Sequence, residues 1–152
     1  MGLILMAGPA SAAESPRATG TVADAKAGDA NTQATWFLLR NRKLSGKCIA
    51  NHHPKVFVYR CEPDYADQLW TLSGVGQLAN GKSGACLAMH ANGRVFTHRC
   101  DTYQDQRWIF RDVGDGFLIE NAEHRGKCIA AHSDGKVFGF RCTTGYQDQH
   151  WY

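Results

Sequence analysis

The chain has 152 residues, enough for one domain with a single hydrophobic core, and nothing in its composition calls for a second domain. Its formal net charge of +3 comes from lysines and arginines that are spread along the sequence, which argues against a nucleic-acid-binding protein. No stretch approaches the roughly 20 apolar residues needed to span a bilayer, so no membrane span is predicted.

The N-terminal residues have the features of a secretory signal peptide. A short apolar run is followed by Ala10-Ser11-Ala12, the small-x-small pattern that signal peptidase accepts. We predict a signal peptide over residues 1–12 and a secreted chain, although no basic residue precedes the apolar run; the alternative is the apolar tail of a cytosolic protein. Residues 13–34 are rich in Ala, Gly, Thr and Asp, which predicts a flexible leader.

Three copies of one unit follow the leader, over residues 35–73, 74–111 and 112–152. Each unit contains a cysteine, a Val-Phe pair, an Arg-Cys pair and a final Asp-Gln-x-Trp, always in this order. The recurring cysteines are Cys48 and Cys61, Cys86 and Cys100, and Cys128 and Cys142, and the recurring tryptophans are Trp70, Trp108 and Trp151. These tryptophans are predicted core residues, with each neighbouring glutamine bound to the backbone of its own unit.

The units are predicted to be built of strands. Runs such as "WFLLRN", "CIANH", "VFVYRC" and "QLWTLS" are short and rich in β-branched or aromatic residues, which indicates about four strands per unit and about twelve overall. Asn92-Gly93 and Asp134-Gly135 are typical of hairpin turns because they tolerate a positive φ. No stretch has the apolar spacing of a helix. We therefore predict a closed, threefold all-β architecture, since closure removes exposed strand edges.

The triple Gln-x-Trp signature, the cysteine pair in each unit and the unit length of about 40 residues resemble the ricin B-chain type β-trefoil lectins. The resemblance covers residues 35–152. It implies a β-trefoil, a six-stranded barrel capped by three hairpins, with up to three shallow carbohydrate sites.

A histidine four residues after the first cysteine of each pair raises a metal alternative, because a thiolate and an imidazole on one strand face can bind zinc. In an exported chain, six cysteines in three equivalent pairs, 13 or 14 positions apart, are better explained by disulfides. We predict the bridges Cys48–Cys61, Cys86–Cys100 and Cys128–Cys142, with no metal and no cofactor.

One face of each hairpin, on the side of the disulfide, is the candidate wall of a pocket. The resemblance implies an aspartate two residues after the first cysteine, which anchors sugar hydroxyls, and an aromatic residue two before the second, which stacks on the sugar ring. The aromatic ring is present, as Tyr59, His98 and Phe140. The aspartate is replaced by Ala50, Ala88 and Ala130, which predicts weak or no binding of simple galactosides.

All three units depart from the family in the same way, which suggests a remodelled site. We hypothesise that the aspartate before each Gln-x-Trp supplies the carboxylate, with the histidine opposite: Asp67 with His52, Asp105 with His90, and Asp148 with His132. The first unit is predicted to be strongest, because the Tyr59 ring also carries a hydroxyl. In the alternative, the histidines hydrogen-bond the hairpin backbone and the aspartates cap turns. In the first unit His53 could replace His52.

The predicted function is a secreted, non-enzymatic carbohydrate-binding module whose partner is a glycan or glycoconjugate, with three weak sites that gain avidity together. The alternative is a structural or protein-binding trefoil, such as the targeting subunit of a toxin or an accessory domain of an enzyme. An enzyme is disfavoured, because the distinctive groups are repeated three times and no unit adds a nucleophile beside its histidine.

Overall fold

The computed structural model describes residues 34–152. The predicted signal peptide, residues 1–12, and the predicted leader up to residue 33 lie outside these residues. The strands are β1 (Lys47–His52), β2 (Lys55–Arg60), β3 (Trp70–Leu72), β4 (Leu78–Asn80), β5 (Cys86–Met89), β6 (Val95–His98), β7 (Trp108–Asp112), β8 (Phe117–Asn121), β9 (Lys127–Ala131) and β10 (Val137–Arg141), and the 3-10 turns are η2 (Ala66–Gln68), η3 (Gln104–Gln106) and η4 (Gln147–Gln149). In this part of the chain no helix is long and apolar enough to cross a membrane.

Six chain segments close into a barrel. β3 pairs with β4 and β7 pairs with β8 as antiparallel ladders. Isolated bridges complete the ring, at Phe37–Trp70, Gln77–Arg107, Phe117–Trp151 and Asn41–Trp151. The described residues thus form ten strands rather than about twelve, because the segments near residues 37–41 and at the C-terminus contribute only single bridges to their neighbours. The all-β trefoil prediction is confirmed.

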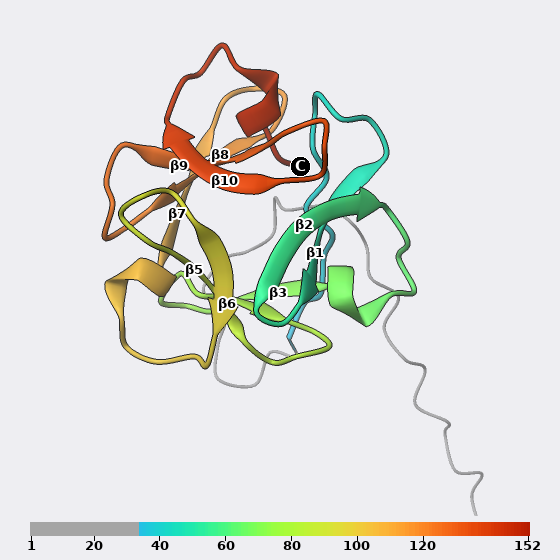
Figure 1. Cartoon of the computed structure of the whole chain (residues 1–152), viewed down its shortest axis with the longest axis vertical. Coiled ribbons are helices and arrows are strands. Elements are labelled where there is room, and N and C mark those ends of the chain that lie inside the picture. Colours follow the sequence, from blue (N-terminus) through green and yellow to red (C-terminus); the bar gives the residue numbers. More distant parts are fainter. Residues whose placement is uncertain (1–33) are drawn as a thin grey trace, which may run out of the picture.

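Three hairpins, β1–β2, β5–β6 and β9–β10, cover one end of the barrel and surround the centre of the molecule (Figure 1). The turn of each hairpin docks on a strand of another. The carbonyl oxygens of Pro54, Gly93 and Gly135 accept hydrogen bonds from the backbone N–H groups of Thr97, Gly139 and Val58, over 2.9, 2.6 and 2.9 Å. These contacts run in a circle, so the hairpins support one another.

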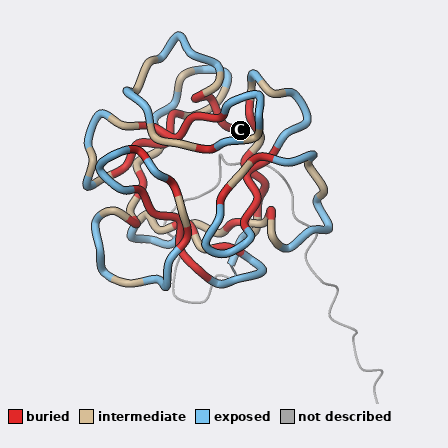
Figure 2. Tube along the Cα trace, viewed as in Figure 1, coloured by how far each residue is buried: buried red, intermediate tan, exposed pale blue. Residues whose placement is uncertain are grey.

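The predicted disulfides are all present, as Cys48–Cys61, Cys86–Cys100 and Cys128–Cys142, with Cα separations of 5.0, 4.9 and 4.9 Å. The tryptophans are buried as predicted, and the Nε1 groups of Trp70, Trp108 and Trp151 donate to the carbonyl oxygens of Ile49, Leu87 and Ile129. Each glutamine binds the backbone of its own unit; Gln68 accepts from the N–H of Glu62 and donates to the carbonyl of Arg60. Figure 2 shows that the exposed segments are mainly the turns, around a buried interior.

The three contacts between hairpins are filled differently inside the core. Asn51, Met89 and Ala131 occupy equivalent positions, three residues after the first cysteine. Asn51 donates to the hydroxyl of Thr97 on the next hairpin at 2.8 Å, and both side chains are buried. Met89 lies against Gly139, where an added Cβ would overlap its Cε and Sδ atoms. By the threefold relation, the buried residues Ala131 and Val58 are the equivalent pair at the third contact, so a bulky residue is matched with a small one in two of the three pairs.

The third unit contains a buried carboxylate that its counterparts lack. Glu120 is 2% exposed and pairs with Arg111 at 2.7 Å and with Arg125 at 2.6 Å. Its oxygen lies within 4.8 Å of the sulfurs of Cys128 and Cys142, an arrangement with the shape of a metal site. Both sulfurs are joined in a disulfide, so neither is a thiolate. Glu120 and its two arginines therefore form a structural ion cluster rather than a metal site.

Replacing Glu120 with alanine is expected to lower the free energy of unfolding by about 1–3 kcal/mol, because two charge-assisted bonds are lost while the freed arginines can still reach solvent. Urea titration followed by tryptophan fluorescence measures this. Glu123→Ala, an exposed acidic residue on the following loop, is the control and should change stability by less than about 0.5 kcal/mol. Equal effects of the two variants would contradict a structural role for the cluster.

Candidate functional site

In the first unit the predicted residues meet on the outer face of the β1–β2 hairpin. Ala50 lies opposite Phe57, and the next pairs on the same face join Cys48 to Tyr59 and His52 to Lys55. Asp67 reaches this face from η2, and its Oδ2 lies 3.3 Å from Nε2 of His52. The ring of Tyr59 is 50% exposed. A carboxylate, an imidazole and an accessible aromatic ring therefore share one surface, above a buried alanine.

His53 does not take the place of His52. Its Nδ1 lies 2.9 Å from the hydroxyl of Thr97, so it faces the neighbouring hairpin rather than Asp67. The alternative, in which the histidines hydrogen-bond the hairpin backbone and the aspartates cap turns, is also wrong. None of the three 3-10 turns has a side-chain cap, and among residues 34–152 the rings of His52, His90 and His132 make no hydrogen bond to the hairpin backbone.

The second unit keeps the aspartate but not the pair. The ring of His90 stacks on Phe96, with centroids 4.3 Å apart, and makes no ion pair with Asp105. Within the described chain, the buried Oδ1 of Asp105 has no hydrogen-bond partner. Desolvated carboxylate oxygens without a donor are costly, so this buried oxygen is an unsatisfied acceptor. His98 lies exposed on the same hairpin.

In the third unit the histidine pairs with a different aspartate. Nδ1 of His132 lies 3.2 Å from Oδ1 of Asp134, a residue of the hairpin turn. The pKa of Asp134 is lowered, first by the hydrogen bond from the backbone N–H of Lys136 and further by His132. Asp148 forms no ion pair with a histidine of the described chain. Phe140 is 50% exposed. The predicted histidine–aspartate pair thus forms in one unit of three.

The length of the hairpin turn explains this difference. In the first unit the turn is one residue shorter, so His52 ends a strand and its ring lies edge-on to Phe57 at 5.2 Å. His90 and His132 follow the ends of β5 and β9 and belong to longer turns. Asp134, two residues after His132 in that turn, then competes with Asp148 for the imidazole.

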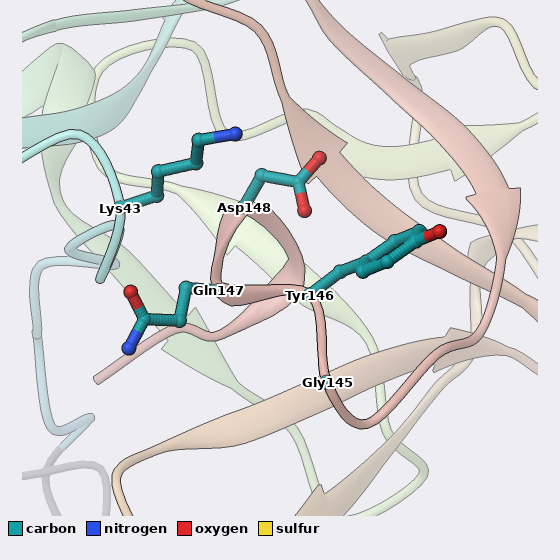
Figure 3. A pocket seen from close by; sticks show the side chains of 5 residues that line it. All are labelled: Lys43, Gly145, Tyr146, Gln147 and Asp148. Atoms are coloured by element: carbon teal, nitrogen blue, oxygen red, sulfur yellow. The ribbon is translucent and has the colours of Figure 1, made fainter.

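A second aromatic ring in each unit was missed. Tyr65, Tyr103 and Tyr146 directly precede the 3-10 turns and are 50%, 58% and 51% exposed. A signal was available, because Tyr-x-Asp-Gln occurs in all three units. Around Asp148, an open cavity of about 470 Å³ is lined by Lys43, Gly145, Tyr146, Gln147 and Asp148. Figure 3 shows Tyr146 and Asp148 projecting to the same side, with Gln147 on the other.

Each aspartate is positioned by an asparagine from a barrel segment of another unit. The amide groups of Asn80, Asn121 and Asn41 donate to the carbonyl oxygens of Asp67, Asp105 and Asp148 at 2.9, 2.8 and 2.9 Å. All three asparagines are buried. The sequence carries this signal as well, since an asparagine precedes the first cysteine of each unit by six or seven positions.

Residues 35–151 match the family described as the ricin-type beta-trefoil lectin domain. The hemolytic lectin CEL-III is 31% identical with a TM-score of 0.67, over 76% of this chain and 29% of CEL-III. The designed 3-fold symmetric protein ThreeFoil is 23% identical with a TM-score of 0.68, over 76% of this chain and 95% of ThreeFoil.

A Polyporus squamosus lectin, solved with the epitope Neu5Aca2-6Galb1-4GlcNAc, is 19% identical with a TM-score of 0.68, over 80% of this chain and 49% of the lectin. No curated protein matches the chain. The chain spans under a third of the length of CEL-III. At 23% and 19% identity, the likenesses to ThreeFoil and the Polyporus lectin concern the fold alone.

Proposed function

Because the chain belongs to the ricin-type beta-trefoil lectin domain family, we propose that it is a secreted, non-enzymatic carbohydrate-binding module with remodelled sites. One observation carries the proposal: in every unit an aspartate, fixed through its backbone by an asparagine, lies two residues after an exposed tyrosine. Carboxylate oxygens accept hydrogen bonds from sugar hydroxyls, and aromatic rings pack against pyranose C–H faces. The three disulfides support an extracellular location.

The floor of each site supports a specificity other than simple galactosides. Ala50, Ala88 and Ala130 are buried at 1%, 0% and 0% exposure and offer no acceptor. Hydroxyl recognition then depends on the aspartate of the 3-10 turn, which approaches from another side. Lactose is expected to bind with a dissociation constant of about 1 mM or weaker in titration calorimetry. Sub-millimolar binding would mean that another group replaces the missing anchor.

Replacing all three aspartates, as Asp67→Asn, Asp105→Asn and Asp148→Asn together, is expected to weaken the best ligand of a glycan array at least tenfold. A charge-assisted hydrogen bond contributes about 1.5–3 kcal/mol, and the amide keeps the shape of the side chain while losing the charge. Asp64→Asn, an exposed aspartate three residues before Asp67, is the matched control and should bind as the wild type does. Unchanged binding by the triple variant would refute the aspartate sites.

A second candidate function is favoured by the three buried alanines, which remove the usual sugar anchor. It is a protein-binding trefoil, such as the targeting subunit of a toxin or an accessory domain of an enzyme. A glycan array without any ligand, together with capture of a partner protein that the triple aspartate variant still binds, would support this candidate.

A further inference from the structure

Charge is distributed unevenly between the three hairpins and the rest of the described chain. We define the cap as the three hairpins, residues 47–60, 86–99 and 127–141. The cap contains eight lysines and arginines and one acidic residue, Asp134, whereas the other described residues contain seven basic and ten acidic residues. This asymmetry is hidden in the linear sequence, where basic residues are spread evenly.

Three of the cap cations form a ring with three phenyl groups. Lys55, Arg94 and Lys136 each begin the returning strand of a hairpin or directly precede it, and all are exposed. Each forms an antiparallel bridge with a phenylalanine of another hairpin, as Lys55–Phe96, Arg94–Phe138 and Lys136–Phe57. The phenylalanines are partly buried. Cations and rings therefore alternate around the centre that the hairpins enclose in Figure 1.

These cations lack an ion-pair partner within the described chain, although Lys136 helps to lower the pKa of the nearby Asp134, first through its backbone N–H and further through its charge. No ion pair involves Lys55, Arg94 or Lys136. Instead, the ammonium of Lys55 lies 5.9 Å from the centroid of Phe57, and the guanidinium of Arg94 lies 5.7 Å from that of Phe96.

Of the five other cations in the cap, two form ion pairs. Arg60 lies 2.6 Å from Glu62, and Arg99 lies 3.5 Å from Asp101. By strand alternation these arginines point away from the face that carries Lys55 and Arg94. On the outer face all three cations of the ring lack an ion-pair partner within the described chain. On the other face Arg60 and Arg99 are paired, whereas Lys47, Lys127 and Arg141 form no ion pair among residues 34–152.

We propose that the cap binds an acidic polysaccharide, a chain of pyranose rings that bear carboxylate or sulfate groups. Lys55, Arg94 and Lys136 pair with the anionic groups, while the phenyl rings contact the apolar faces of the sugars. This inference rests on the proposed carbohydrate-binding function but uses different residues. The three aspartates repel acidic sugars, so neutral glycans occupy the aspartate sites and acidic chains occupy the cap.

The test compares polygalacturonate with its fully methyl-esterified form, which has the same backbone without the charge. Calorimetry at about 0.1 M salt should show binding of polygalacturonate and much weaker binding of the ester. The variant Lys55→Ala/Arg94→Ala/Lys136→Ala should bind polygalacturonate at least about 30-fold more weakly, while keeping its neutral ligand on the glycan array. Circular dichroism checks that this variant is folded.

The matched control is Arg60→Ala/Arg99→Ala/Arg141→Ala, which removes the same charge from the same hairpins on the other face. It should keep polygalacturonate affinity within about threefold. The proposed role of Lys55, Arg94 and Lys136 would be contradicted if both triple variants lost polygalacturonate affinity equally. An equal loss of this affinity in the triple aspartate variant would contradict it as well. Absence of binding to both polygalacturonate and dextran sulfate would also overturn it. Tighter binding of duplex DNA or phosphatidylserine vesicles through the same three cations would replace the polysaccharide with that partner.

The two proposals fail separately in these measurements. Loss of neutral glycan binding in the aspartate variant, with polygalacturonate binding unchanged, supports both. If no neutral glycan binds while the cap variant still loses polygalacturonate, the aspartate sites fail and the cap remains.

Discussion

Replacing Gly139 with valine is expected to lower the free energy of unfolding by about 3 kcal/mol, and adding Met89→Ala is expected to restore much of that loss. A Cβ at Gly139 overlaps the Cε and Sδ atoms of Met89, and crowding of a packed core costs about 1–3 kcal/mol. Met89→Ala alone leaves a cavity and costs about 2–5 kcal/mol. Together, the two changes recreate the valine–alanine pair of Val58 and Ala131.

Urea titration of the wild type, the two single variants and the double variant gives the coupling energy between positions 89 and 139 directly. The double variant should be more stable than the sum of the single effects by at least about 1 kcal/mol. Gly145→Val is the control for the glycine change, because no atom lies within 4 Å of a Cβ there, and its effect should stay below about 0.5 kcal/mol. Additive effects of Gly139→Val and Met89→Ala would contradict this account of the core.

Full reduction of the three disulfides is expected to leave the domain mostly unfolded at 37 °C. Each bridge closes a loop of 13 or 14 residues, worth about 3 kcal/mol in the chain-entropy model, so the three contribute roughly 9 kcal/mol. Domains of this size are stable by about 5–15 kcal/mol in all. Loss of the three disulfides therefore removes most of the free energy of unfolding.

Near-ultraviolet circular dichroism, before and after reduction, measures this loss through the buried tryptophans. Reduction needs mild denaturant, because Cys48, Cys86 and Cys128 are buried. Pairwise Cys→Ala variants serve as the comparison, and each should lose about 3 kcal/mol, since the loops are nearly equal in length. If the reduced and oxidised proteins unfolded at the same urea concentration, the hairpins would be held by packing alone.

Much of the fold could be predicted from the sequence because every signal occurs three times. The disulfide partners followed from six cysteines in three equivalent pairs, and the buried tryptophans followed from the Gln-x-Trp signature. The strand count was overestimated, because the outermost segments contribute only bridges to the barrel. Whether a segment forms a strand or a bridge depends on its neighbours, which a single repeat does not reveal.

The site was less predictable, because side-chain partners depend on the turns. His52 meets Asp67 as predicted, whereas one additional residue in the turn directs His132 to Asp134. Lys55, Arg94 and Lys136 each precede a Val-Phe pair, so a basic-Val-Phe repeat was visible in the sequence. That each cation lies beside the phenylalanine of another hairpin follows only from the packing of the three hairpins. The tyrosines before the 3-10 turns were visible in the sequence as a repeat, but their exposure follows only from the packing of the turn.

The asparagine contacts make the three candidate sites depend on one another in a circle. Asn80 of the second unit supports Asp67 of the first, Asn121 of the third supports Asp105 of the second, and Asn41 of the first supports Asp148 of the third. A fragment that lacks residues up to 41 would lose the support of the site farthest from the cut in sequence. A single unit on its own would lack the asparagine that supports its aspartate. Three separate copies of such a unit, assembled as a trimer, would restore the same circle of contacts.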